Sequence, residues 1–275
     1  MRVLIDGRAV DAADAAISVF DHGLLRGDGC FEALRSYEGS PYALGPHLDR
    51  LAASAALLSM DLPPRKELER WVRAVARDGG DCTVRVVATR GGFDPDANAA
   101  PRVVVLWEPI PELPEHLCVL PLPAPWHSDG VTSELTGAKT LSYAPNMAAN
   151  RAARLAGFDD ALLHGRSGRI LEGPTFSVAW VVDGVLETPS LDLGILASIT
   201  RGTALQEAES AGIGVRQGHF DLDRLDDADE VMALSTVKEV KAIVRVGERR
   251  FEPGPVTELL ARRYRHRVET VLTNG

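Results

Sequence analysis

One lysine stands alone in the stretch TGAKTLSYAPN, residues 136–146, of a chain that otherwise uses arginine for positive charge. Only four lysines occur in the sequence, and Lys139 is the only charged residue between Glu134 and Arg151. Arginine cannot be deprotonated under working conditions, whereas a desolvated lysine can lose its proton and become a nucleophile or a base. Such lysines form Schiff bases with carbonyl compounds. The alternative is an ordinary surface lysine with a snorkelling stem.

A carboxylate and a set of anion-binding groups follow Lys139 along the chain. Glu172, in RILEGPTFS, lies at the expected end of a strand. A carboxylate facing a pyridine nitrogen keeps that nitrogen protonated and makes the ring an electron sink; alternatively, Glu172 is a solvated turn residue. Ser198-Ile199-Thr200 precede an expected helix. Backbone N–H groups and hydroxyls at a helix N-terminus bind phosphate, although a plain N-cap has the same composition.

An arginine in the middle of an expected helix completes the set. Arg50, in HLDRLAASA, lies beside an apolar stripe and therefore needs an anionic partner. A phosphate would serve, and the alternatives are a salt bridge with Asp49 or Asp61, or plain exposure to solvent. An amine, a ring-facing carboxylate and two anion-binding features together favour one phosphorylated aldehyde, pyridoxal 5'-phosphate.

Hydrophobic periodicity and turn residues predict an α/β chain with two domains. Strands are expected at 3–5, 8–10, 29–37, 41–44, 82–91 and 101–107, as two strands within 160–173, as a hairpin over 176–189, and within 229–246. Helices are expected at 46–60, 65–77, 142–157, 199–213 and 255–272. A proline-rich stretch marks the crossing between domains. The predicted division is an N-terminal domain over 1–115, a linker over 116–125 and a C-terminal domain over 126–275.

Composition limits the classes of function. The net charge of −9 and a pI near 5.3 argue against nucleic-acid binding. The three cysteines lie far apart, which fits a reducing cytoplasm, and the scattered histidines have no metal-ligand spacing. No signal peptide is evident, and no apolar run approaches the roughly 20 residues that span a bilayer. We therefore expect a cytoplasmic protein with no membrane, nucleic-acid or metal partner.

The order and spacing of these features resemble the class IV aminotransferases, the fold-type IV pyridoxal-phosphate enzymes. The segments that carry the resemblance are DHGLLRGDGCFEALR (21–35), HLDRLAASAALL (47–58), AKTLSYAPNMAA (138–149), DDALLHGRSGRILEGPTFSVAWV (159–181), LGILASITRGTAL (193–205) and DEVMALSTVKEV (229–240). The resemblance implies a smaller N-terminal α/β domain, a larger C-terminal β-barrel-like domain with flanking helices, and a homodimer.

The resemblance also assigns roles to individual residues. Lys139 matches the Schiff-base lysine and the catalytic base, and Glu172 matches the carboxylate on the pyridine nitrogen. Arg50, Ile199, Thr200 and Thr236 match the phosphate site, with Ser198 standing where many relatives have glycine. Tyr143 is similar to the residue near the cofactor's phenolic oxygen. Arg26, with His22 close by, is expected on the substrate side of the cofactor, and Arg85 either binds a substrate carboxylate or pairs within the sheet.

The reaction is less constrained than the cofactor. D-amino acid aminotransferases place an Arg-x-His pair after the TRG segment, and TRGGFDPDAN, residues 89–98, has none. Branched-chain enzymes have Arg-Pro where Arg85 is followed by valine. KTLSYAPNMAA and LEGPTFSV most resemble short bacterial aminodeoxychorismate lyases. We therefore expect a lyase that releases pyruvate and 4-aminobenzoate from a small-molecule amine. The alternatives are an aminotransferase of branched-chain or D-amino acids, or a binding protein without catalysis.

Overall fold

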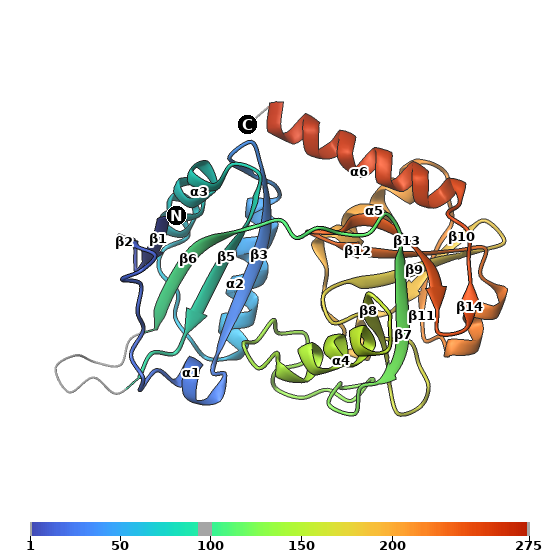
Figure 1. The fold of residues 1–275 in the computed structure, drawn as a ribbon, viewed down its shortest axis with the longest axis horizontal. Helices are drawn as coiled ribbons and strands as arrows, with labels where there is room; N and C mark the ends of the chain where they lie inside the picture. The colour runs from blue at the N-terminus through green and yellow to red at the C-terminus, as the bar shows by residue number, and fades with distance from the viewer. Residues whose placement is uncertain (1, 93–100, 274–275) are drawn as a thin grey trace. The chain divides into compact units, whose positions relative to one another are not determined.

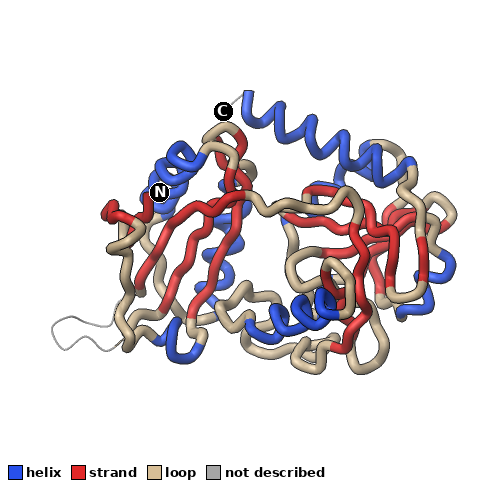
Figure 2. The backbone as a smooth tube through the Cα atoms, viewed as in Figure 1, coloured by secondary structure: helices blue, strands red, loops and turns tan. Residues whose placement is uncertain are grey.

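The computed structural model describes residues 2–92 and 101–273, which form two compact units. The first contains residues 1–111 together with 138–143, and the second contains residues 112–137 together with 144–275. The chain therefore enters the second unit near the predicted boundary, but returns to the first for the six residues that include Lys139. Figures 1 and 2 show the elements of both units.

The first unit is a wholly antiparallel sheet with helices packed on it. Its strand order is β2-β1-β6-β5-β3-β4. The strands are β1 (Arg2–Ile5), β2 (Arg8–Asp11), β3 (Gly29–Tyr37), β4 (Ser40–Pro41), β5 (Cys82–Thr89) and β6 (Arg102–Pro109). The helices are α1 (His22–Arg26), α2 (Leu44–Leu57) and α3 (Arg65–Gly79). Helix α2 packs on β3, and α3 packs on β5 and β6. This unit confirms the predicted hairpin at 3–10, because Asp6 and Gly7 both adopt positive φ between β1 and β2.

Alternation along β3 decides which side chains face the helices. Cys30 and Leu34 belong to the hydrophobic core that α2 and α3 cover, together with Leu51 of α2. Since side chains alternate across a strand, Glu32 lies on the same face as Cys30 and Leu34. The sheet thus carries a carboxylate into an otherwise apolar layer, whereas Phe31 faces the other way.

The second unit is a mixed sheet with three longer helices. Its strand order is β11-β10-β9-β12-β13-β7-β8, with β14 paired to β13. The strands are β7 (Leu117–Pro123), β8 (Asp160–His164), β9 (Ser177–Val182), β10 (Val185–Pro189), β11 (Val215–Gly218), β12 (Glu230–Ser235), β13 (Glu239–Val246) and β14 (Arg249–Arg250). The helices are α4 (Ala144–Leu155), α5 (Ile199–Ser210) and α6 (Pro255–Thr273), with short 3₁₀ turns η1 (Leu191–Leu193) and η2 (Leu222–Asp227). Among the described residues, no helix is both long and apolar enough to cross a membrane.

The predicted linker over 116–125 is mostly a strand, β7, paired in parallel with both β8 and β13. Its pairing with β13 reaches only Val119, whereas its pairing with β8 continues to Pro123. The Ala124 N–H bonds the carbonyl of His164, so alternate residues turn their backbone nitrogens toward β8. Pro121 and Pro123 alternate with these residues, so their backbone nitrogens face away from β8. No strand pairs with β7 on that side beyond Val119, so the missing N–H groups cost no hydrogen bond there. The linker prediction was wrong because prolines are also tolerated in a strand on the side where it has no partner.

Two smaller predictions also differ from the structure. The second strand expected within 160–173 forms only isolated bridges, such as that between His164 and Ile170. Helix α2 begins at Leu44 rather than at Pro46. Proline is tolerated throughout the first turn of a helix, so its position marks a helix start only to within a few residues.

Burial should protect two of the three cysteines from alkylation. Cys30 and Cys82 are fully buried, and Cys118 is partly exposed. Burial, with a smaller contribution from nearby Glu32, raises the pKa of the Cys30 thiol to about 12, and burial also raises the pKa of Cys82. We expect iodoacetamide to modify only Cys118 in the folded protein and all three thiols in urea. Intact-mass spectrometry would check this, and rapid modification of Cys30 would contradict the packing of β3 against α2.

Candidate functional site

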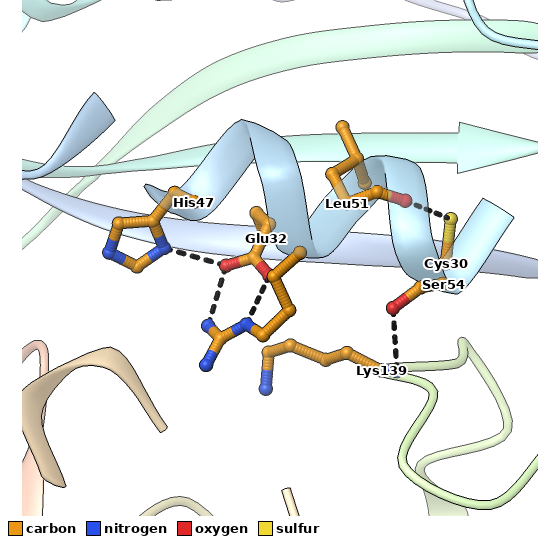
Figure 3. Close-up of polar contacts among 7 residues, drawn as sticks. Cys30, Glu32, His47, Leu51, Ser54 and Lys139 are labelled. Carbon is orange, nitrogen blue, oxygen red and sulfur yellow. Dashed lines mark hydrogen bonds and ion pairs between the residues drawn. The ribbon is translucent and has the colours of Figure 1, made fainter. Parts of the chain in front are cut away.

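The segment that carries Lys139 is held on the first unit by backbone pairing with the start of β3. Phe31 donates its N–H to the carbonyl of Lys139 at 3.0 Å, and Leu141 donates to the carbonyl of Gly29 at 2.9 Å. The Lys139 N–H donates to the hydroxyl of Ser54, on α2, at 3.0 Å. Figure 3 shows Lys139 beside α2 and β3. Two bonds thus fix the backbone of Lys139 and a third fixes Leu141, which leaves the side chain of the lysine as the movable part.

Two aromatic rings lie against the amine of Lys139. Its Nζ is 4.4 Å from the centre of the Phe31 ring and 5.2 Å from that of Tyr143. The two rings pack edge to face with their centres 5.3 Å apart. Aromatic faces attract an ammonium group. The structure therefore brings both Tyr143 and Phe31 to Lys139, while the place of Tyr143 near the cofactor's phenolic oxygen stays a prediction.

Arg50 projects from α2 onto the buried carboxylate of Glu32. Its Nε donates to Oε1 at 2.7 Å, and one terminal nitrogen donates to Oε2 at 2.8 Å. His47, one turn earlier on α2, bonds the same Oε2 through Nδ1 at 2.7 Å (Figure 3). Neither aspartate considered from the sequence fills this place. Asp49 instead pairs with the exposed Arg65.

The two-point contact fixes the plane of the Arg50 guanidinium. Glu32 accepts from two of the five N–H groups of Arg50, and the binding of a phosphate by this guanidinium stays a prediction. Burial alone would raise the pKa of Glu32, but the hydrogen bonds from Arg50 and His47 outweigh burial and hold that pKa at about 2. Glu32 is therefore ionised at neutral pH.

His47 is neutral in this cluster. Burial lowers its pKa below the ordinary value, against the opposing effect of Glu32, and the charge of Lys139 lowers it further. Because a carboxylate only accepts hydrogen bonds, the single proton of the imidazole lies on Nδ1. The cluster of Glu32, His47 and Arg50 thus has no net charge of its own, and Lys139 adds a positive charge beside it.

In the second unit, Glu172 follows β8 and is held at both its backbone and its carboxylate. Its carbonyl accepts the N–H of Leu163 at 2.8 Å. Its Oε1 lies 3.1 Å from Nε2 of His127, and the N–H of Leu196 approaches Oε1 and Oε2 at 3.4 and 3.3 Å. The carboxylate is largely buried but keeps some exposure, at 14%. This is a fixed anion with capacity for one further donor.

The segment after Leu196 leads directly into helix α5. Ser198 caps this helix, because its hydroxyl accepts the N–H of Arg201 at 3.2 Å. Ile199 and Thr200 occupy the first two helical positions, where N–H groups have no acceptor within the helix. Thr200 is buried. Ser198 is therefore a genuine N-cap, and the positions that the resemblance assigns to phosphate binding follow it. Thr236 lies in the turn after β12.

The donor chemistry of each unit fits pyridoxal phosphate. The first unit carries the amine of Lys139, which lies against the Phe31 ring, and the guanidinium of Arg50, which Glu32 orients. In the second unit, the carboxylate of Glu172 meets the N–H of Leu196, which lies only two Cα–Cα steps before Ser198, the N-cap of α5. Such a stretch spans at most about 7 Å, which suits a small ring that carries a phosphate arm.

The structure treats the two predicted substrate arginines differently. Arg85, on β5, donates from Nε to Glu108 of the neighbouring β6 at 2.5 Å. The sequence left two roles open for Arg85, and this contact is the pairing within the sheet rather than the binding of a substrate carboxylate. Arg26 ends the short helix α1 and is exposed. Within TRGGFDPDAN, residues 93–98 lie outside the described residues.

Sequence reasoning missed the residues that support the predicted ones. Glu32 and His47 orient Arg50, Ser54 anchors Lys139, and His127 binds Glu172. A signal existed for His47, because it lies three residues before Arg50 and shares its helix face. The alternation of β3 marked Glu32 as an inward carboxylate. No periodicity pointed to His127, which lies in a loop.

The comparisons with known proteins agree with this arrangement. A profile of the family described as amino-transferase class IV matches residues 29–246. A putative branched-chain-amino-acid aminotransferase from Methanocaldococcus jannaschii is 32% identical, with 96% of each chain covered. A bifunctional aminodeoxychorismate lyase and D-amino acid transaminase from Mycobacterium tuberculosis is 28% identical, over 95% of this chain and 96% of that protein.

Among solved structures, a fold IV transaminase from Curtobacterium pusillum superposes with a TM-score of 0.84 and 32% identity, over 93% of this chain and 91% of that one. The predicted α/β fold of the fold-type IV enzymes is confirmed by this likeness, and the strand pairing described above forms two sheets. The chain belongs to the class IV aminotransferase family and is a pyridoxal-phosphate enzyme, as its residues predicted.

Proposed function

We propose that this protein is a 4-amino-4-deoxychorismate lyase, which releases pyruvate and forms 4-aminobenzoate. The observation that favours the lyase is the engagement of Arg85 by Glu108, because it occupies the arginine that a branched-chain substrate carboxylate would need. The sequence also lacks the Arg-x-His pair of D-amino acid aminotransferases. The resemblance of KTLSYAPNMAA and LEGPTFSV to lyases supports the same choice.

Each residue has a defined task in this proposal. When bound, the cofactor supplies a carbonyl carbon for amine exchange and a ring that accepts electrons. Lys139 would hold the cofactor at that carbon, and its amine would take the proton from the substrate ring carbon that bears the amino group. Glu172 keeps the pyridine nitrogen protonated. Arg50, Ile199, Thr200 and Thr236 hold the phosphate. Loss of pyruvate then leaves an aromatic product, and aromatisation drives this step.

An aminotransferase of branched-chain or D-amino acids is the second candidate. The relatives from Methanocaldococcus jannaschii and Mycobacterium tuberculosis carry these activities in their names. The second of those names joins a lyase to a transaminase, so one chain of this family can combine the two. In this case Lys139 would take the proton from Cα of the amino acid, and the product would be a keto acid.

One assay separates the two candidates. Aminodeoxychorismate is generated enzymatically, the purified protein is added, and 4-aminobenzoate is followed by its fluorescence. Pyruvate is measured in parallel, and equal amounts of the two products are expected from the lyase. A protein that carries the cofactor but forms no 4-aminobenzoate would refute the lyase. A panel of L- and D-amino acids with 2-oxoglutarate would then identify the transaminase activity.

The proposal includes a cytoplasmic homodimer, as the family resemblance implies. Light scattering coupled to size-exclusion chromatography should give twice the mass of 29.6 kDa for one chain. A protein that stays monomeric at all concentrations and still turns over substrate would contradict the dimer but not the reaction.

A further inference from the structure

His127 lies in a tight turn that aims its ring at Glu172. The turn follows β7 and is closed by the N–H of His127, which donates to the carbonyl of Ala124 at 2.9 Å. The preceding Trp126 donates from its indole to Asn146 of α4 at 2.9 Å. The backbone of His127 and the side chain of Trp126 are thus anchored within the second unit. The resulting contact, from Nε2 to Oε1 of Glu172, measures 3.1 Å.

The surroundings of the two ring nitrogens of His127 identify its protonation state and tautomer. The His127 side chain is 9% exposed, and its Nδ1 is buried without a hydrogen-bond partner among the described residues. A carboxylate only accepts, so the proton must lie on Nε2. A second proton on Nδ1 would bury an unpaired charged donor, which is more costly than a bare lone pair. His127 is therefore a neutral donor with its proton on Nε2.

The neutral form matters for the charge that Glu172 presents. A hydrogen bond from a neutral donor fixes the direction of a carboxylate and leaves its full negative charge. An imidazolium would instead offset the negative charge of Glu172. The carboxylate would then stabilise a proton on a facing base, such as a pyridine nitrogen, less strongly. Arg201 is a cation close enough to act on Glu172, and it is already bonded to Thr188, to the carbonyl of Pro189 and to Gln217.

We propose that His127 is a positioning residue that holds Glu172 toward the pyridine nitrogen of the cofactor while leaving the carboxylate charge intact. This inference rests on the proposed role of Glu172 in the cofactor site. It does not depend on whether the enzyme is a lyase or an aminotransferase. Its prediction is specific: an uncharged donor at position 127 preserves protonation of the ring nitrogen, and a cation there removes it.

The first test uses the protein without cofactor. Two-bond ¹H–¹⁵N NMR spectra distinguish a protonated from a bare imidazole nitrogen, and His127→Gln identifies the signals of His127 among the seven histidines. We expect a protonated Nε2 and a bare Nδ1, and we expect the Nε2 signal to shift in Glu172→Gln. A proton on Nδ1, or no response to Glu172→Gln, would overturn the inference.

The second test uses pyridoxal phosphate labelled with ¹⁵N in the ring, whose chemical shift reports protonation of that nitrogen. His127→Gln keeps a donor and should retain the wild-type shift. His127→Lys should move the shift toward the unprotonated value. His127→Phe should raise the Kd for the cofactor about tenfold, because one hydrogen bond to a charged group is lost.

The outcomes of the two tests separate this inference from the proposed function. An unchanged ring shift in His127→Lys would refute the role of His127, even if the enzyme turns over its substrate. Failure of the wild type to bind pyridoxal phosphate would refute the proposed function. In that case the NMR spectra of the free protein would still decide whether His127 holds Glu172.

Discussion

Lys139→Ala is expected to lower turnover by at least about 10²- to 10⁴-fold, the range for loss of a positioned proton-transfer group. It should also remove the site at which borohydride fixes the cofactor to the protein. Lys139→Arg should be equally inactive, because a guanidinium stays protonated and cannot form the covalent link. Reduction of the wild type followed by peptide mass spectrometry should place the cofactor on Lys139.

The small number of lysines makes this experiment unambiguous. Lys238 is the one competitor of physical interest, because burial lowers its pKa despite the neighbouring charge of Asp160. However, its Nζ donates to Thr175 at 2.6 Å and lies 3.3 Å from Asp160, so it is committed to a buried ion pair. Lys66→Arg, on the exposed surface of α3, is the matched control and should keep full activity. A cofactor recovered on Lys238 would overturn the assignment of Lys139.

The parts of this molecule that follow local rules could be predicted from the sequence. The Asp6-Gly7 turn has the φ angles that its residue types favour, and Ser198 caps α5 as a serine before a helix should. Lys139 stood out as a charged residue in an otherwise uncharged stretch, and Glu172 as a carboxylate at the expected end of a strand. Such local conflicts are expected where function overrides stability.

The remaining features depend on contacts between residues that lie far apart in the sequence. Glu32 meets Arg50 only because β3 and α2 pack together, and no local pattern prefers Glu32 over Asp49 as its partner. Lys139 belongs to the first unit through pairing with β3, although most of its sequence neighbours belong to the second. The prolines of β7 look like a linker until the extent of each neighbouring strand is known. Such features require the tertiary structure.

Glu32→Gln is expected to destabilise the first unit by about 3–5 kcal/mol, the usual effect of breaking a buried ion pair. The side chain of Glu32 is fully buried, and that of Arg50 is 13% exposed. Lowering the pKa of Glu32 from 4.5 to about 2 corresponds to about 3 kcal/mol in favour of the ionised form, which agrees in size. Urea unfolding would measure the loss, and hydrogen exchange in the α2 and β3 peptides would locate it.

Asp49→Asn is the matched control, because it removes a carboxylate from the same helix. Asp49 pairs with Arg65 on the surface, where both side chains are about half exposed or more. Exposed ion pairs contribute about 0–1 kcal/mol, so this variant should unfold almost like the wild type. Equal effects of Glu32→Gln and Asp49→Asn would contradict the buried cluster.

The dependence of stability on pH gives an independent test of the same cluster. A carboxylate whose pKa is lowered on folding stabilises the protein above its unfolded value, here 4.5, and this contribution is lost as pH falls toward about 2. His47, whose pKa is also lowered on folding, adds a loss that begins below 6.5. In Glu32→Gln, the loss of stability that Glu32 causes between pH 4.5 and about pH 2 should vanish. The free energy of unfolding should therefore fall less steeply with decreasing pH in this range than in the wild type. An unchanged slope would mean that Glu32 is not the residue that titrates.

Because Glu32 holds the guanidinium of Arg50 in place, the same variant should bind pyridoxal phosphate more weakly, even at neutral pH.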